Sequence, residues 1–396
     1  MKKTSDPIAI VAAKRTPMGA FQGQFKSLTS PQLAAAAIAA AVEQSTVNGK
    51  DFSEAILGCV LPAGVGQAPA RQAVLAAGLP TSLPCTTINK VCGSGMKAAM
   101  LAHDQILAGV ADVIVAGGME SMTNAPYLLP KARGGYRLGH GQLLDHMFYD
   151  GLQNPYDNQL MGAFAEQCAD KYGFTREQQD AFAAESVRRA LAAMKEGAFA
   201  SEIAAIMLAG KKGELRVESD EIPPTCDVAK ISTLKPAFRK EGGTVTPANS
   251  SSIADGAAAL VLMAESEAAK RGLKPLARFC GHATFAQEPS WFTTAPVGAI
   301  DKLQRQLGWA AKDVDLYEIN EAFAVVTMAA MRDLELPHAK VNVNGGACAL
   351  GHPIGASGAR LMVTLLYALK RRGGKRGIAS LCLGGGEATA VAIELV

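Results

Sequence analysis

The stretch Val341–Arg360, VNVNGGACALGHPIGASGAR, is rich in glycine and holds one histidine, His352, but no acidic residue. After the Ser357–Gly358 pair, apolar residues recur at helical spacing and predict a helix over residues 359–370. Glycines let the backbone approach a ligand closely, and a helix N-terminus offers free N–H groups and partial positive charge. The stretch therefore predicts a functional loop that opens onto a helix, although a turn-rich connection with a buried histidine fits the same residues.

A related arrangement surrounds Cys92, in the segment INKVCGSGMKAAMLA. In both segments a Ser-Gly pair opens a predicted helix, and a basic residue, Lys97 or Arg360, follows two positions after that glycine. Each helix leads to a strand that ends in Gly-Gly with an acidic residue soon after. This self-similarity indicates an internal duplication of an α/β unit.

Strand, glycine turn, helix and strand in this order form a βαβ unit and place the chain in the α/β class. Two such copies packed helix to helix predict a five-layer α/β/α/β/α body with an active site between them. We expect a first domain over residues 1–270, a loop domain inserted at about 120–250, and a second domain over 274–396.

Capping residues predict several element ends. Ser30 is expected to be the N-cap of the first long helix, with Pro31 in its first turn, and Thr175 with Gln178 forms a capping box for a second. Residues 93–95 are expected to form a tight turn before a helix over residues 96–108.

The composition excludes several classes of protein. The 396 residues are 49% hydrophobic and 19% charged, with a net charge of +3, so a folded protein without a nucleic-acid surface is expected. No stretch approaches the roughly 20 apolar residues of a membrane span, and Asp6 and Pro7 follow Lys2 and Lys3 where a signal peptide would turn apolar. We expect a cytoplasmic protein. Eight cysteines without C-x-x-C spacing argue against disulfides and a zinc ribbon.

Three residues at glycine turns or strand ends join His352 as candidates for chemistry. Cys92 precedes a helix, and a helix N-terminus with a neighbouring histidine would lower its pKa below the usual value of about 8.5. Cys382 ends a strand before a run of three glycines, so it too points into a turn. Asn320 lies between a strand and a helix, where it would either cap the helix or donate to an oxyanion.

The sequence resembles the thiolase family, of the acetyl-CoA acetyltransferase kind, over essentially its whole length. Six motifs in order carry the resemblance: VCGSGMKA around Cys92, GGMESM at 117–122, NSSSIADGAAA at 249–259, NEAFA at 320–324, GGACALGHPIGASGAR at 345–360 and CLGGG at 382–386. The resemblance implies the duplicated thiolase fold described above.

The resemblance also implies catalytic roles. Cys92 would be the nucleophile that carries the acyl group as a thioester, and His352 would take the thiol proton. Cys382 would be the acid/base at the acetyl-CoA methyl carbon. Asn320 would hold a water that forms one oxyanion hole with His352, and the N–H groups of Cys92 and Gly384 would form the second.

Five further positions are implied in binding of substrate and CoA: Ser251, at the pantetheine arm, together with Leu160, Met161, Ala322 and Phe323. The implied partners are acyl-CoA and CoA, with no metal and no cofactor beyond CoA as substrate and product. The family also implies a homotetramer, a dimer of dimers, assembled through the loop at residues 125–145.

The sequence departs from the family pattern at three places near the predicted CoA and acyl sites. Leu160 stands where short-chain enzymes usually carry a histidine, and Pro223-Pro224 stands where an arginine is common. Trp291 and Phe292 occupy a loop that usually places a methionine against the acyl group, so they are candidates for closing the acyl pocket.

Other functions remain alternatives. A degradative 3-ketoacyl-CoA thiolase acting on longer chains is the nearest, and a non-catalytic acyl-CoA or lipid carrier on the same fold is another. The decarboxylating ketoacyl synthases usually carry histidine or asparagine where Cys382 stands. A dinucleotide-binding dehydrogenase is disfavoured because no G-x-G-x-x-G follows the first strand.

Overall fold

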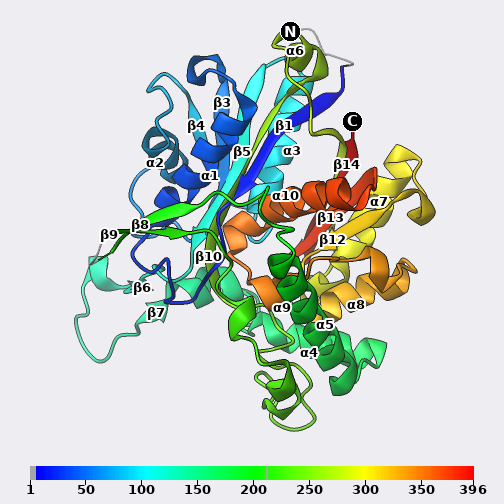
Figure 1. Ribbon diagram of the computed structural model, residues 1–396. Helices are drawn as coiled ribbons and strands as arrows, with labels where there is room; N and C mark the ends of the chain where they lie inside the picture. Colours follow the sequence, from blue (N-terminus) through cyan, green and yellow to red (C-terminus); the bar gives the residue numbers. More distant parts are fainter. Residues whose placement is uncertain (1–5, 211–212) are drawn as a thin grey trace.

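The computed structural model of the protein describes residues 6–210 and 213–396 (Figure 1). Lys2 and Lys3, on which the expectation about a signal peptide rested, lie outside the described residues. Within the described ranges no helix is both long enough and apolar enough to cross a bilayer.

A mixed sheet of ten strands runs through the described part of the chain. Its first half contains, in spatial order, β1 (Ile8–Arg15), β10 (Ala254–Ala264), β5 (Val113–Ser121), β3 (Glu54–Gly58) and β4 (Cys85–Ile88), with β2 (Gly19–Ala20) paired to β10. Its second half contains β11 (Ala277–Ala286), β14 (Glu387–Leu395), β13 (Arg376–Leu383) and β12 (Leu316–Ile319).

Helices cover the outer faces of the two halves of this sheet, and further helices lie between the halves (Figure 1). They are α1 (Ser30–Ser45), α2 (Pro69–Ala76), α3 (Ser94–Leu107), α4 (Met161–Tyr172), α5 (Arg176–Lys195), α6 (Glu265–Lys270), α7 (Ala295–Leu307), α8 (Ala324–Asp333), α9 (Ala347–Leu350) and α10 (Ile354–Arg372).

The strand pairing repeats between the two halves. β1 pairs antiparallel with β10, β10 antiparallel with β5, and β5 parallel with β3. In the second half β11, β14, β13 and β12 follow the same sequence of pairings. Even the parallel strand β4 has a counterpart, the parallel bridge between Tyr317 and Val341. The duplication inferred from the glycine motifs is therefore present in the backbone.

The layers follow from which side chains pack together. Leu260 and Leu262 of β10 belong to the same core as residues of α3, α10, β13 and β14. The alternate residues Val261 and Met263 pack with α1 and α2 on the outer face. α7 lies outside the second half. The order is helix, sheet, helix, sheet, helix, as expected for the α/β thiolase-like fold. The two sheet layers are nevertheless continuous, because β1 and β11 join over three residue pairs.

Helices α3 and α10 meet almost backbone to backbone at their N-terminal ends. A Cβ atom on Gly358 would lie 2.5 Å from the backbone nitrogen of Met96, and one on Gly95 would lie 3.0 Å from the backbone of Gly355 and of Ala359. Only glycine allows this approach, so the paired Ser-Gly motifs bring together the two segments that carry Cys92 and His352.

Only some elements of the region between β5 and β10 were predicted from the sequence. The capping box of Thr175 with Gln178 is confirmed at the start of α5. Helix α4 and the hairpins β6–β7 (Tyr127–Leu128, Leu144–Asp145) and β8–β9 (Ile206–Gly210, Gly213–Val217) were not predicted. The boundaries proposed for the domains and for the insertion stay predictions.

Three predicted boundaries were wrong, and two of them lie at the site. Thr29, not Ser30, is the N-cap of α1, since its partner in the capping box is Gln32. Gly95 lies inside α3, which begins at Ser94, so residues 93–95 do not form a separate turn. α10 begins at Ile354, five residues before its predicted start, which places His352 next to the N-cap residue Pro353.

The variant Gly358→Ala tests the contact between α3 and α10. We expect it to lower the free energy of unfolding by about 1–3 kcal/mol, because the added methyl group must push two backbones apart. Urea unfolding of both proteins measures this change. Gly134→Ala is the control, since a Cβ at Gly134 meets nothing within 4 Å. Equal urea midpoints for Gly358→Ala and Gly134→Ala would contradict the packing argument.

Candidate active site

A cavity of about 700 Å³ opens between the two halves of the molecule and the inserted region, and its lining is mostly apolar. Every predicted site residue except Asn320 lines it: Cys92, Leu160, Met161, Ser251, Ala322, Phe323, His352, Cys382 and Gly384. The chain thus brings together in one cavity residues that are up to 292 positions apart in the sequence.

Cys92 is held by a strained turn between β4 and α3. The preceding residue, Val91, has φ +46°, a left-handed conformation that β-branched residues avoid. The Ser94 hydroxyl stabilises this turn, since it donates to the Val91 carbonyl at 2.6 Å and accepts from the Lys90 N–H at 2.8 Å. Strain of this kind persists only where the surrounding structure enforces it. Here it presents the thiol to the cavity.

The predicted lowering of the Cys92 pKa was wrong. Burial among apolar groups dominates and raises the pKa of the Cys92 thiol to about 12. The backbone N–H groups of Gly384 and of Cys92 itself act in the opposite direction, because they stabilise negative charge on the sulfur. These are the two donors that the family resemblance assigns to the second oxyanion hole, and both lie close to the thiol.

Cys382 is the second thiol at the cavity. It lies at the end of β13, is only 1% exposed, and burial raises its pKa well above the ordinary value. The neighbouring Cys92 contributes to that rise, because two thiolates side by side would repel each other. The turn that follows contains Gly385 and Gly386, both with positive φ, which directs the Gly384 N–H toward Cys92.

The hydrogen bonds around His352 define which ring nitrogen carries the proton. The Ser357 hydroxyl lies 2.5 Å from Nδ1 and donates its own proton to the Pro353 carbonyl at 2.9 Å. Nδ1 must therefore be the protonated nitrogen and donate to Ser357. Nε2 is left as the unprotonated nitrogen, so its lone pair can accept a hydrogen bond or a proton.

Asn320 lies behind His352 rather than on the cavity wall. Its Nδ2 is 3.3 Å from His352 Nε2, and its Oδ1 is 3.5 Å from Nη2 of the buried Arg360. Because a guanidinium can only donate, Arg360 fixes the amide with its oxygen toward the arginine and its NH₂ toward the histidine. Asn320 is not a helix N-cap, since α8 begins at Ala324 with Phe323 as its cap.

Burial and the positive charge of Arg360 both keep His352 neutral. Burial is the larger effect, and together they lower the pKa of His352 to about 3. At neutral pH the imidazole is thus an unprotonated base at Nε2. A thiol, a second thiol, a neutral imidazole and paired N–H donors in one apolar cavity can carry out acyl transfer through a thioester.

Comparison with known proteins agrees with this geometry. Residues 8–266 match the model of the thiolase N-terminal domain, and residues 273–395 match that of the thiolase C-terminal domain. The chain belongs to the thiolase family.

Curated relatives cover nearly the whole of this thiolase. Acetyl-CoA acetyltransferase 2 of Arabidopsis thaliana is 50% identical over 98% of this chain and 97% of its own length. The acetyl-CoA acetyltransferase of Chromobacterium violaceum is 49% identical, and that of Cupriavidus necator 47%, each over 98% of this chain and 99% of its own length.

Some residues of this thiolase site were not found, or were misplaced, by sequence reasoning. Ser357 and Arg360 were noted only as part of a helix start, and nothing in the spacing shows that they contact His352 and Asn320. Phe292 lines the cavity as predicted, but Trp291 does not, because its ring packs under Lys171, whose Nζ lies 4.2 Å from the ring centre.

The raised thiol pKa predicts how Cys92 reacts with iodoacetamide in the ligand-free enzyme. Only the thiolate reacts, so the inactivation rate should climb about tenfold per pH unit from pH 7 to pH 10, without levelling near pH 8.5. Residual activity after timed exposure at each pH measures the rate, with N-acetylcysteine as the unperturbed thiol. A plateau below pH 8.5 would show that the thiol is activated before substrate binds.

Replacement of Asn320 by alanine tests whether the Asn320 side-chain amide, which lies behind His352, contributes to catalysis. We expect kcat to fall about 10²–10³-fold, as for loss of one oxyanion donor, with little change in KM because Asn320 does not line the cavity. Steady-state kinetics measure both constants. Asn48→Ala, at an exposed asparagine, is the control. A folded Asn320→Ala enzyme with unchanged kcat would remove Asn320 from the mechanism.

Proposed function

We propose that this protein is an acetyl-CoA acetyltransferase that condenses two acetyl-CoA molecules to acetoacetyl-CoA and CoA, and catalyses the reverse thiolysis. The observation that carries this proposal is the convergence of Cys92, Cys382 and His352 on one cavity. The names of relatives about 50% identical over the full chain support the same substrate.

The first half-reaction loads the acetyl group on Cys92. His352 Nε2 takes the thiol proton as the sulfur attacks the thioester carbon, and the N–H groups of Cys92 and Gly384 stabilise the oxyanion. CoA leaves as a thiolate and takes a proton from Cys382. The products of this step are the acetyl-enzyme, free CoA, a protonated His352 and a thiolate at Cys382.

The second half-reaction forms the carbon–carbon bond. The Cys382 thiolate removes a methyl proton from the second acetyl-CoA, and the resulting enolate oxygen accepts from the protonated Nε2 of His352 and from a water held by Asn320. The enolate carbon attacks the thioester on Cys92. The Cys92 sulfur departs and regains its proton from His352, so both cysteines and the histidine return to their starting states.

The high thiol pKa explains why a nearby base is needed. With a pKa of about 12, very little thiolate is present before substrate binds. Transfer of the proton to His352 during attack avoids a free thiolate in an apolar cavity. The proton then becomes the donor that the second half-reaction requires, so one group serves both steps.

The remaining wall of the cavity fits the arm of CoA. Ser251, Leu160 and Met161 lie on this wall with Ala322 and Phe323, and we propose that they contact the pantetheine. Leu160 offers an apolar contact in place of the usual histidine. The stretch with Pro223 folds as a short 3₁₀ helix whose Thr225 also lines the cavity.

Assembly and location stay proposals. The loop at residues 125–145 exposes large apolar side chains, including Leu138 at 97% and Tyr127 at 62%. This fits the homotetramer expected from the family, in which such a loop packs against its copies. A cytoplasmic location stays a prediction from the sequence.

The degradative thiolase and the non-catalytic carrier are not favoured. The relatives carry the acetyltransferase name, and a carrier has no use for two thiols beside an unprotonated imidazole. Phe292 is 3% exposed and fills part of the cavity wall, where it would meet a longer acyl tail.

Thiolysis rates for acetoacetyl-CoA and longer 3-ketoacyl-CoA substrates test the proposed specificity. We expect kcat/KM to fall steeply beyond the four-carbon substrate. Phe292→Ala should raise kcat/KM for the six-carbon substrate, relative to the four-carbon substrate, by about tenfold or more. The reason is that one buried methylene is worth roughly 1–3 kcal/mol in a pocket. Trp291→Ala, which changes a residue outside the wall, is the matched control. A flat profile in the unmodified enzyme would favour the degradative function.

A further inference from the structure

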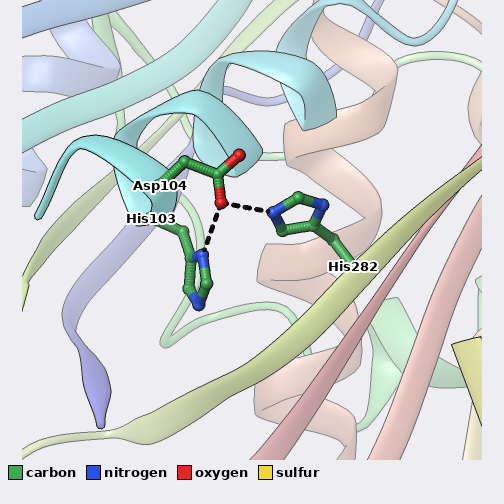
Figure 2. A group of neighbouring side chains, drawn as sticks. All are labelled: His103, Asp104 and His282. Carbon is green, nitrogen blue, oxygen red and sulfur yellow. Dashed lines mark hydrogen bonds and ion pairs between the residues drawn. The ribbon is translucent and has the colours of Figure 1, made fainter. Parts of the chain in front are cut away.

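Three potential metal ligands meet far from the active site, between α3 and β11. Figure 2 shows the side chains of His103, Asp104 and His282 converging on one point. Asp104 Oδ1 lies 3.1 Å from His103 Nδ1 and 2.8 Å from His282 Nε2. The three ligand atoms all lie within 4.8 Å of one another. Sequence reading missed this group because His282 is 178 positions from Asp104.

The surroundings hold the two rings in place and leave one side open. The His103 ring packs at a tilt of 38° against the buried Phe279 with ring centres 4.7 Å apart, and His282 packs edge-on to the same ring at 5.9 Å. The side chains of the histidines are 13% and 18% exposed, while that of Asp104 is 50% exposed. An ion at this point would therefore have protein ligands on one side and water on the other.

The chemistry of these ligands is that of a transition-metal site. Two imidazoles and one carboxylate bind Zn²⁺ at about 2.0–2.2 Å, with water in the remaining position. Ligands of a tetrahedral ion are then roughly 3.3 Å apart. The two separations from Asp104 are already near that value, so small shifts of the side chains within their packing on Phe279 would bring all three ligand atoms onto one ion. Each neutral histidine can carry its proton on the nitrogen that faces away, so that the facing nitrogen binds.

We propose that His103, Asp104 and His282 form a binding site for Zn²⁺ or a related divalent transition-metal ion. The ion would join the two halves of the duplicated fold, since α3 belongs to the first and β11 to the second. These halves are otherwise connected in the sheet by the three residue pairs of β1 and β11. His103 lies eleven residues beyond Cys92, or roughly 16 Å along α3, so the ion acts on stability and not on acyl transfer.

Titration of the chelator-treated, full-length protein with Zn²⁺ in a calorimeter tests this proposal. We expect one ion per chain, and a higher midpoint of thermal unfolding when Zn²⁺ is present, because a ligand of the native state stabilises it. His103→Gln and His282→Gln should each weaken binding at least tenfold and abolish the rise in midpoint. His140→Gln, at an exposed loop histidine, is the matched control and should change neither.

Titration with Co²⁺ separates this site from the thiols of the active site. Binding to imidazole and carboxylate gives d–d absorption bands without a thiolate-to-metal charge-transfer band, and that spectrum should disappear in His282→Gln. A charge-transfer band, binding unchanged in both glutamine variants, or no binding of either metal at millimolar concentration would overturn the proposal. Thiolysis activity that is the same in all three variants confirms that they are folded.

Discussion

The contact between the N-terminal ends of α3 and α10 is the constraint on which the site depends. One helix belongs to each copy of the duplicated unit, and each is preceded by a functional residue, Cys92 or His352. Because Gly95 and Gly358 let the two backbones touch, these residues reach the same cavity. Any side chain larger than hydrogen at Gly358 would separate the nucleophile from its base. The glycines of the two Ser-Gly motifs therefore act through packing between helices as much as through turns.

Much of the fold could be predicted because its signals are local. Short apolar runs gave β1 and β5, the second of which leads into Gly117-Gly118, and Thr175 with Gln178 gave the start of α5. The duplication was visible because both copies keep the same Ser-Gly helix start. Helix α4 and the short hairpins were missed because they lie among prolines and glycines, where single residues do not distinguish a loop from a short element.

The candidate site could be predicted through its motifs, but its electrostatics could not. A cysteine before a helix suggests a lowered pKa, yet the cavity is mostly apolar and burial outweighs the backbone N–H groups. Cys92 packs against residues as distant as Met147 and Ile354, which the sequence around Cys92 does not reveal. The partners of Asn320 and His352 were likewise hidden, because Arg360 and Ser357 reach them only once α10 is formed.

The buried positive charge of Arg360, which lies behind the His352 imidazole, affects both the stability of the core and the chemistry of the site. Arg360 is fully buried, and its Nη1 is 3.6 Å from Glu318, so this contact recovers only part of the cost of removing the guanidinium from water. Burial raises the pKa of Glu318 to about 8 and lowers that of Arg360. A hydrophobic pair would suit the core better, but it would release the Asn320 amide and remove the positive charge that helps keep His352 unprotonated. The central layer thus retains Arg360 beside Glu318 because the orientation of the Asn320 amide against Nε2 of His352 depends on the guanidinium.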